Sequence, residues 1–524
     1  MAKESSNDGA LEVALVTINE GRQALLFVNS KRSAEKMADD IASKLKPDES
    51  FKKISQEAEN TLSRPTKQCL RLSRCLKKGI AFHHAGLHQK QKTLIEDNFR
   101  DGKIKIICCT PTLAAGMDLP AFRVIIRDLK RYGGHWGMTP IPVLEYLQMA
   151  GRAGRPGKEK QGEAISIAST DSEKEEIHET YVRGKPEDIY SKLAVEPVLR
   201  TYVLSLVASG FIRNETGLKD FFGKTFWAQQ YQDRDKLNTI ISRMIDLLER
   251  YRFIESAENP SDFVSANEFE EKRLKATPLG RRVAELYLDP LTANHLILNM
   301  IKAEKRLDDE NEHKRTADEF SILQMISHTI EMMPLLRVKT KEIEAINDTL
   351  ADKQDFLLEE EPSLYDTDYD EFLSSIKTTL FFMDWIGEKD DEFLLEKYDI
   401  RPGETRYKLD KAKWLFYACS EFCKLLSFEK TGRLVRKCEL RVKYGVKEEL
   451  LPLLKLSRIG RTRARKLFNN QIKSLKDIKK ADMTTLSFLL GPSIARNIKI
   501  QLDQEEKPVK KGTRKGQLSV EKFS

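Results

Sequence analysis

The stretch "KIKIICCTPTLAAGMDLPAFRVIIRD", residues 103–128, decides the fold of the first part of the chain. It begins with a β-rich apolar run, crosses a polar loop that contains a glycine, and ends in a second strand pattern at 123–128. Further short strands are predicted at 23–30, 79–87 and 162–169. Because helical patterns separate these strands, the sequence indicates a parallel sheet with helices on both faces. In such folds, functional loops lie at the carboxyl ends of the strands.

Two helices between these strands carry terminal signals. The helix after the strand 23–30 is predicted to have Ser33 as its N-cap, because a serine side chain can accept a bond from a free backbone N–H at this position. The helix "VLEYLQMAGRAG" (143–154) is expected to end in its glycines. The α/β part of the chain is therefore assigned to residues 1–185.

Amphipathic helical patterns dominate from about residue 186 onward. A β-like break near 253–277 interrupts them, which predicts a small helical domain with a β-wing at 186–288. The segment 289–446 is helical in pattern and includes one long helix from Thr405 to about Phe428.

The C-terminal part divides into a helical segment and a tail. Residues 447–503 contain two helix–glycine–helix units, and the tail 504–524 is polar, basic and expected to be disordered. The fold class that we expect is therefore multidomain, with an α/β domain followed by α-helical domains.

Composition places the chain among soluble proteins. The 524 residues are 40% hydrophobic and 32% charged, with a net charge of +8. No apolar run approaches the ~18–20 residues that span a bilayer, and the N-terminus lacks the layout of a signal peptide. The seven cysteines form no CxxC pair, so buried free thiols and a cytoplasmic location are expected. The basic stretch 455–480 favours nucleic acid, whereas the acidic stretch 352–371 is expected to be a solvated face or a linker.

The stretch "EYLQMAGRAGRPG" (145–157) carries the clearest chemical signal. Arg152 and Arg155 lie three residues apart on one face of a helical turn, and Gly151 and Gly154 let the backbone approach a ligand closely. Planar guanidinium groups suit phosphate oxygens and can neutralise the charge that develops during phosphoryl transfer. Taken alone, the stretch fits a loose basic loop equally well.

The loop that begins at Thr110 offers groups for a nucleic-acid backbone. Thr110, Thr112 and the bare amide of Gly116 can hold phosphate or sugar oxygens, and Asp118 can contact a ribose or orient an arginine. Further back, "FHHAGL" (82–87) contains a histidine pair. No third ligand has suitable spacing, so no metal site is predicted.

Four of these stretches occur together in one order, which makes them specific as a set. They resemble motifs IV, IVa, V and VI in the second RecA-like domain of a superfamily-two helicase. The matching stretches are "FVNSKRSAE" (27–35), "FHHAGL" (82–87), "TPTLAAGMDLPAFRVIIRD" (110–128) and "QMAGRAGRPG" (148–157).

The rest of the chain resembles one branch of that superfamily, the archaeal Hjm helicases, whose eukaryotic relative is HelQ. The similarity covers roughly residues 10–503. It rests on "LKATPLGRRVAELYLDPLTA" (274–293), "DWIGEKDDEFLLEKYDIRPGETRYKLDKAKWL" (384–415) and "LLKLSRIGRTRARKLF" (453–468). The resemblance implies a RecA-like domain at 1–185, a winged helix at 186–288, a helical ratchet domain at 289–446 and a helix-hairpin-helix domain at 447–503.

The resemblance implies ATP-driven 3′-to-5′ translocation on single-stranded DNA and unwinding of fork-type substrates in replication-coupled repair and recombination. ATP and Mg²⁺ are the implied cofactors. Arg152 and Arg155 match the arginine fingers of motif VI and are assigned to catalysis. Gln148, Gly151 and Asp118 are assigned to the nucleotide side of the site.

The DNA side of the site is assigned to motifs IVa and V. Thr112, Gly116 and His84 are the residues that the resemblance places against DNA. One departure from the family pattern is Asp118, where this family often carries Asn. Asp is common there in other superfamily-two helicases.

Between motifs V and VI, "RDLKRYGGHWGMTPIP" (127–142) has two β-prone arms around a Gly-Gly turn. A plain surface hairpin is one interpretation. The resemblance implies a strand-separating hairpin instead, with Tyr132 and Trp136 assigned to DNA. Stacking of a base on an aromatic side chain is worth about 1–3 kcal/mol, which suits such a wedge.

Two further sets of side chains are assigned to DNA. On the long helix, Trp414 is either a core residue or, as the resemblance implies, a platform for a base, and Lys411 is within reach of phosphate. In "LSRIGRTRARKLF" (456–468), the amide of Gly460 can bind a phosphate at a helix N-terminus without reading sequence. Three arginines enrich this first unit, namely Arg461, Arg463 and Arg465. The second unit, "LSFLLGPSIARNI", lacks this charge and is interpreted as a packing half.

The tail ends in "QLSVEKFS" (517–524), where Gln517, Val520 and Phe523 have the spacing of sliding-clamp-binding peptides. A second aromatic residue of that motif is absent, and a chance match is the alternative.

A nucleotide cradle is absent from the sequence. A P-loop requires G-x-x-x-x-G-K-[ST]; "GLKDFFGKT" (217–225) has the wrong spacing, and no DExH box occurs. The chain is therefore expected to be the C-terminal portion of a helicase that lacks its first RecA-like domain, the part that mainly binds ATP and Mg²⁺. The alternative is a non-catalytic DNA-binding remnant. The expected partners are single-stranded and branched DNA, and no membrane association is expected. The protein is expected to be monomeric and associated with the nucleoid.

Overall fold

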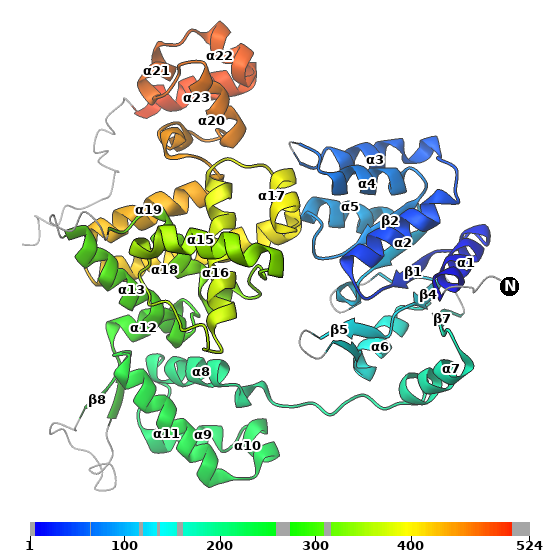
Figure 1. Ribbon diagram of the computed structural model, residues 1–524, viewed down its shortest axis with the longest axis horizontal. Helices are drawn as coiled ribbons and strands as arrows, with labels where there is room; N and C mark the ends of the chain where they lie inside the picture. Colours follow the sequence, from blue (N-terminus) through cyan, green and yellow to red (C-terminus); the bar gives the residue numbers. More distant parts are fainter. Residues whose placement is uncertain are drawn as a thin grey trace, which may run out of the picture. The chain divides into compact units, whose positions relative to one another are not determined.

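The structure is a computed structural model that describes residues 6–62, 64–114, 119–133, 137–154, 161–257, 273–308 and 316–505. The chain divides into two compact units, and Figure 1 shows the helices and strands that make them up, coloured along the sequence. The first unit comprises Met1–Leu291 with Asp390–Asp410, and the second comprises Thr292–Lys389 with Lys411–Ser524. Each unit has an apolar core of its own.

The first unit is built on a five-stranded parallel sheet with the strand order β2-β3-β1-β4-β7. Ala24 pairs with Ile106 on one side and with Arg123 on the other, so β1 lies in the centre. All residues of β1 to β4 are buried, which means that both faces of this part of the sheet are covered. The predicted parallel sheet is thereby confirmed. Its strands are Ala24–Phe27 (β1), Ile80–His83 (β2), Ile106–Cys109 (β3), Arg123–Ile126 (β4) and Glu163–Ser166 (β7).

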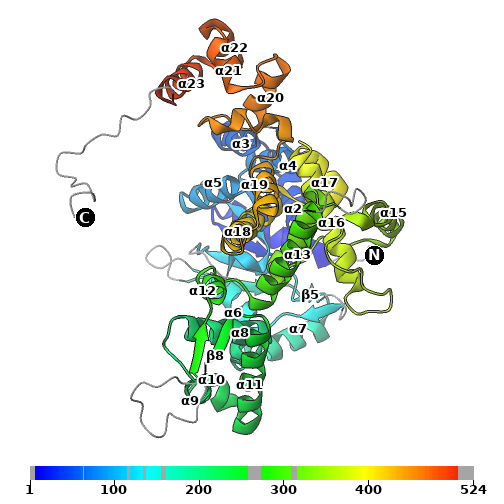
Figure 2. The same cartoon turned by 90° about the vertical axis from the view of Figure 1, so that its left-hand side faces the viewer.

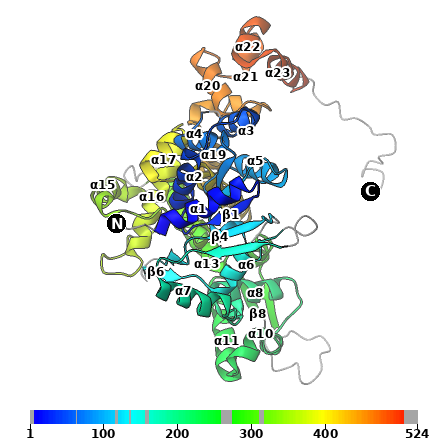
Figure 3. The ribbon, with the colours of Figure 1, turned by 90° about the vertical axis from the view of Figure 1, so that its right-hand side faces the viewer.

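Helices connect and cover these strands. Figure 3 shows α1 beside β1 and β4, against which it packs. The predicted N-cap of α2 is wrong by one turn, because Ser30 Oγ accepts from the Ser33 backbone N–H at 3.1 Å while the Ser33 hydroxyl turns back to Asn29. The helices are Ser6–Asn19 (α1), Lys31–Ser43 (α2), Lys52–Glu59 (α3), Lys67–Leu76 (α4), Gln89–Arg100 (α5), Val143–Ala150 (α6) and Asp171–Ile177 (α7).

A mainly helical group follows within the first unit, and it contains the predicted β-like break as an antiparallel pair. Figure 2 shows β8 alongside α11. Arg200 of α8 forms a buried two-bond pair with Asp289, at 2.6 Å and 2.8 Å, which ties α8 to the end of this group. The elements are Glu196–Ala208 (α8), Glu215–Phe222 (α9), Phe226–Tyr231 (α10), Arg234–Arg250 (α11), Ile254–Ala257 (β8), Arg273–Ala276 (β9) and Pro278–Glu285 (α12). Its identity as a winged helix stays a prediction.

The described part of the second unit is helical. The long helix α18 spans Pro402–Leu425, three residues earlier at each end than predicted. Proline is favoured in the first turn of a helix, and the left-handed backbone of Ser427 (φ 59°) lies just beyond the end. The other helices are Pro290–Asp308 (α13), Glu319–Ser327 (α14), Ile343–Lys353 (α15), Tyr369–Ile386 (α16), Asp391–Tyr398 (α17), Glu429–Tyr444 (α19), Arg461–Asn469 (α20), Leu475–Lys480 (α21), Met483–Leu490 (α22) and Pro492–Glu505 (α23). Of these, α17 and the start of α18 belong to the first unit.

The acidic stretch 352–371 is not entirely solvated. Glu359 is largely buried and pairs with His328 at 2.8 Å, and Leu357 and Leu358 are buried beside it. The seven cysteines are all buried free thiols. Within the described residues, no cluster of His, Cys, Asp or Glu suits a metal ion, and no helix there is long and apolar enough to cross a membrane.

Candidate nucleotide and DNA interface

The loop after β3 presents hydroxyl groups at the carboxyl end of the sheet. A short 3₁₀ turn, Pro111–Leu113, follows Thr110, and the hydroxyls of Thr110 and Thr112 are 2.9 Å apart. Thr112 is exposed. Of the other residues assigned to this loop, Gly116 and Asp118 lie outside the described residues.

The turn after α6 is joined to the loop of motif V by backbone hydrogen bonds. The Ala121 N–H donates to the Arg152 carbonyl at 3.0 Å, and the Gly154 N–H donates to the Ala121 carbonyl at 2.7 Å. The Arg152 guanidinium adds a 2.6 Å bond from Nη2 to the Ala114 carbonyl. Gly154 has φ +87°, a conformation that favours glycine. The two loops therefore form one connected element.

This arrangement corrects the expected position of the turn 151–154. Ala121 lies just before β4 begins, so the turn lies beside the amino end of β4, whereas Thr112 lies at the carboxyl end of β3. The reason is that β3 and β4 run in the same direction, so the chain leaves β3 at the carboxyl end of the sheet and enters β4 at the amino end. Gln148 and Gly151 are exposed and Arg152 is half-buried, while Arg155 lies outside the described residues.

His84 has no exposed surface, so the structure gives it a different place from the predicted DNA contact. Its Nδ1 accepts from the Gly86 N–H at 3.1 Å, which leaves the Nε2–H to donate to Glu35 at 3.2 Å. Burial lowers the pKa of His84, an effect only partly opposed by the bond to Glu35. We therefore describe His84 as a neutral residue that holds Glu35 and the loop 84–87 in place.

Glu35, on α2, is the charged centre of a buried network that the sequence did not reveal. Besides His84, it accepts from Arg71 Nη1 at 2.7 Å and from Arg401 Nε at 3.2 Å. Burial by itself would raise the pKa of Glu35. The hydrogen bond from His84 and the positive charge of Arg401 outweigh burial and hold this pKa at about 2.

The predicted hairpin is present in its described arms. Strands Lys130–Tyr132 (β5) and Met138–Pro140 (β6) pair antiparallel, and the Gly133 N–H donates to the Gly137 carbonyl at 2.7 Å. Tyr132 is 65% exposed, which leaves its ring available to a ligand. Trp136 lies outside the described residues.

The long helix carries Lys411 and Trp414 close together. Lys411 Nζ lies 5.2 Å from the centre of the Trp414 ring, a cation–π contact. Trp414 is half-buried, so it is neither a full core residue nor fully open. One turn earlier, Lys408 is buried, and burial lowers its pKa to about 8 despite the nearby charge of Glu404.

The arginines assigned to DNA near α20 differ in what they contact. Gly460 is the N-cap of α20, and no atom would meet a Cβ added there. Arg465 forms two bonds to Glu388, at 2.8 Å and 2.5 Å, and the Arg461 guanidinium lies 5.3 Å above the Trp385 ring. Arg463 is exposed, and its Nη1 donates to the carbonyl of Arg458, which precedes α20, at 2.9 Å. Of the three arginines assigned here, Arg463 is the exposed one, whereas Arg461 and Arg465 are partly buried.

The two helix–glycine–helix units are not equivalent. A 3₁₀ turn, Leu453–Lys455, precedes Gly460, so the first unit lacks the full α-helix that was predicted before its glycine. In the second unit, α22 and α23 flank Gly491 as expected. The clamp-type residues Gln517, Val520 and Phe523 lie outside the described residues.

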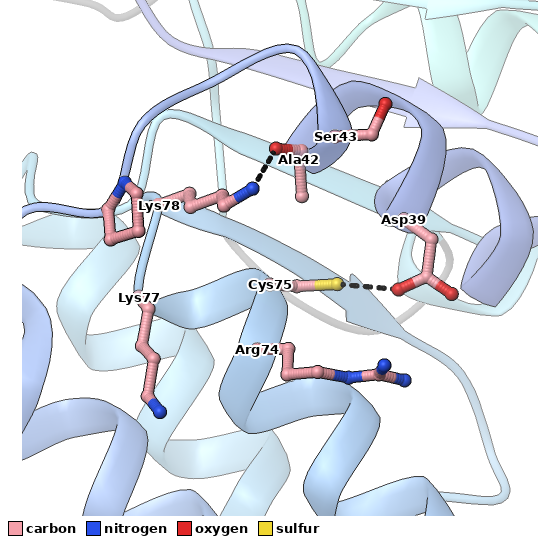
Figure 4. A pocket seen from close by; sticks show the side chains of 8 residues that line it. Asp39, Ala42, Ser43, Arg74, Cys75, Lys77 and Lys78 are labelled. Atoms are coloured by element: carbon pink, nitrogen blue, oxygen red, sulfur yellow. Dashed lines mark hydrogen bonds between the residues drawn. The ribbon is translucent and has the colours of Figure 1, made fainter.

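Two cavities lie in the first unit, and none of the predicted site residues within the described part of the chain lines either of them. One of about 250 Å³ lies at the base of the hairpin, where Asn29, Arg127 and Met138 contribute to its lining. The other, of about 390 Å³, lies between the C-terminal ends of α2 and α4 and is lined by Arg74 and Lys77 among others (Figure 4). Arg74 and Lys77 place positive charge at the C-terminal end of α4, where cations stabilise a helix.

Two helicase family models match parts of the chain. Residues 9–157 match the family described as helicase conserved C-terminal domain, and residues 320–445 match archaeal helicase, domain 4. Both are helicase families, which defines the class of the protein.

The full-length relatives narrow this class. The chain is 38% identical to the ATP-dependent DNA helicase Hel308 of Methanococcus vannielii, over 95% of the chain and 68% of that protein. The Hel308 proteins of Methanocella arvoryzae (37%, covering 93% of the chain and 64% of the relative) and Pyrococcus horikoshii (36%, 97% and 67%) are similar. The chain belongs to the Hel308 family of archaeal helicases, and it spans about two thirds of the length of these relatives.

The buried Lys408 predicts a pH dependence of stability. Its pKa is about 8 in the folded chain against an ordinary value of 10.5, so between these values the unfolded chain binds more protons. The contribution of Lys408 to the free energy of unfolding therefore rises with pH through this window and is lost as the pH falls through 8. The size of the change is about 3 kcal/mol at most.

Denaturant unfolding between pH 7 and 10.5 checks this dependence. Lys408→Met removes it, so the variant is more stable than wild type at pH 7 and the difference shrinks toward pH 10.5. Lys413→Met, which alters an exposed lysine of the same helix, is the control. If Lys408→Met and wild type change in parallel across the window, the burial argument is wrong.

Proposed function

We propose that this chain supplies the second RecA-like domain and the DNA-binding part of an ATP-dependent 3′-to-5′ DNA helicase. The observation that carries the proposal is the connected element of motifs V and VI. Because Arg152 is bonded to Ala114 and its backbone pairs with Ala121, a change at the nucleotide is transmitted directly to the loop that follows β3. The closer relationship to the Hjm and HelQ helicases is part of the same proposal.

In this proposal the side chains divide between nucleotide and DNA. Arg152, with Arg155, neutralises charge on the γ-phosphate, and Gln148, Gly151 and Asp118 face the nucleotide. Guanidinium and amide donors suit phosphate oxygens. The nucleotide cradle and the Mg²⁺ ligands come from a first RecA-like domain, since the 524 residues contain no P-loop or DExH sequence.

The proposed DNA-binding surface combines weak contacts that do not distinguish one base sequence from another. Thr112 and Gly116 hold the backbone, and the exposed Tyr132 with Trp136 stacks against the strand junction. The other contacts come from the second unit, where Lys411, Trp414, Gly460 and Arg463 contribute phosphate and stacking interactions. Single-stranded and fork-type DNA in repair and recombination are the proposed substrates, and the C-terminal tail is a proposed contact for a sliding clamp.

One prediction of this proposal concerns ATP hydrolysis. The 524-residue chain alone shows negligible DNA-stimulated ATPase activity, because its arginines have no bound γ-phosphate to act on. Adding the first RecA-like domain of a Hel308 relative restores the activity, and Arg152→Ala then reduces kcat by about 1000-fold. Arg183→Ala, at an exposed arginine, is the control.

Two outcomes would contradict this. DNA-stimulated hydrolysis by the chain alone that is lost in Arg152→Ala would show that the site is complete. Absence of hydrolysis in the combination, with DNA binding intact, would favour the non-catalytic DNA-binding protein.

Another prediction of this proposal separates two arginines of α20. Arg463→Gln weakens binding to a single-stranded 20-mer, and it makes the slope of log affinity against log salt shallower by about 0.7, as expected for one lost phosphate contact. Arg465→Gln instead lowers the midpoint of thermal unfolding, because it leaves Glu388 without its two-bond partner. Unchanged affinity and slope in Arg463→Gln would remove this helix from the DNA interface.

A further inference from the structure

The segment 390–410 belongs to the sheet unit although it lies far from the sheet in sequence. Figures 1 and 2 show α17 beside α4, and the Lys67 backbone N–H donates to Glu392 at 2.9 Å. Several exposed or partly exposed ion pairs add to this contact, and a solvent-exposed pair is worth little in water. They are Lys31–Glu404, Arg32–Asp399, Arg64–Asp390 and Lys67–Glu396.

One contact of this segment is buried. The side chains of Arg401 and Glu35 are 11% and 8% exposed, and Arg401 Nε donates to Glu35 at 3.2 Å. The Arg401 backbone N–H donates to Glu404, in the first turn of α18, at 3.0 Å. A buried pair that loses one partner leaves an uncompensated charge, so this contact is costly to break.

The backbones of the two segments also touch. The Gly403 N–H donates to the Gly86 carbonyl at 3.0 Å. A Cβ at Gly403 would lie 2.3 Å from the Leu87 carbonyl oxygen and 2.5 Å from that of Ala85. The first turn of α18 therefore packs directly on the loop 84–87.

The same helix continues without a break to Leu425 and carries Lys411 and Trp414. At a rise of 1.5 Å per residue, Trp414 lies about 18 Å along the helix from Pro402. We propose that Arg401 is a positioning residue: it fixes the base of α18 on the loop 84–87 of motif IVa, so that DNA bound at Lys411 and Trp414 acts mechanically on the sheet domain. This inference rests on the proposed function, because it requires DNA to bind α18.

Hydrogen exchange of the full chain, with and without a single-stranded dT 20-mer, tests the role of Arg401. In wild type, the oligonucleotide slows exchange both at residues 411–418 and at the amides of Gly86, Leu87 and Gly403. In Arg401→Gln, these three amides exchange at least about tenfold faster in the free chain. The oligonucleotide still protects 411–418, but its protection no longer reaches 84–87.

Two further variants control for a general loss of structure. Arg64→Gln breaks an exposed pair of the same segment and is expected to behave like wild type. Arg401→Lys keeps the charge beside Glu35 and is expected to retain part of the protection at 84–87. If Arg401→Gln does not fold, Arg401→Lys takes its place in the test, with partial loss of this protection as the expected result.

The outcomes distinguish this inference from the proposed function. If the oligonucleotide protects 411–418 and 84–87 equally in wild type and in Arg401→Gln, Arg401 does not position α18. If wild type shows protection at 411–418 but none at 84–87, the inference that DNA binding at α18 acts on the loop 84–87 is also wrong. If the oligonucleotide neither binds nor protects 411–418 in wild type, the proposed function of α18 fails, and this inference fails with it.

Discussion

The buried hydrogen bonds to the Glu35 carboxylate are the interaction that holds the helices and loops of the sheet unit together. This carboxylate lies on α2 and is held by His84 after β2, by Arg71 on α4 and by Arg401 before α18. A carboxylate taken out of water is stable only while its partners remain. The network therefore acts as a single element, which joins two neighbouring helices, a motif loop and a segment 366 positions away in the sequence.

A second element depends on backbone hydrogen bonds rather than on charge. The turn of motif VI pairs with Ala121 and with the carbonyl of Ala114, so the conformation of Arg152 and that of the loop after β3 are linked. Together with the Glu35 network, this places two mechanical connections in one α/β unit. One joins the turn 151–154 to the loop after β3, and the other joins the loop 84–87 to the base of α18.

The fold could be predicted from the sequence where the signals were local. The apolar runs of β1, β3 and β4 and the helical periods between them correctly indicated a parallel sheet, because burial on both faces requires continuous apolar strands. Helix ends were less certain. Ser30 and Ser33 are equally good N-cap residues by type, and in the structure Ser30 is the cap while the Ser33 hydroxyl donates to Asn29.

The site was predicted less completely, because several contacts join residues that are distant in sequence. His84 matched a DNA-contact motif, yet it is fully buried and bonds to Glu35, which also accepts from Arg401. The DNA contact of Arg465 stays a prediction, and its two bonds to Glu388, from a different part of the chain, are a feature that the sequence did not indicate. No local pattern distinguishes these residues from Arg463, which remains exposed.

Nuclear magnetic resonance of the side-chain carboxyl carbons, with the signal of Glu35 assigned by comparison with Glu35→Gln, tests the Glu35 network most directly. The network holds the pKa of Glu35 at about 2. The Glu35 signal is therefore expected to remain that of an ionised carboxylate as the pH is lowered through the ordinary titration range of glutamate, for as long as the chain stays folded. A midpoint near 4.5 in the folded chain would contradict it, because Glu35 would then lack the buried partners on which the account depends.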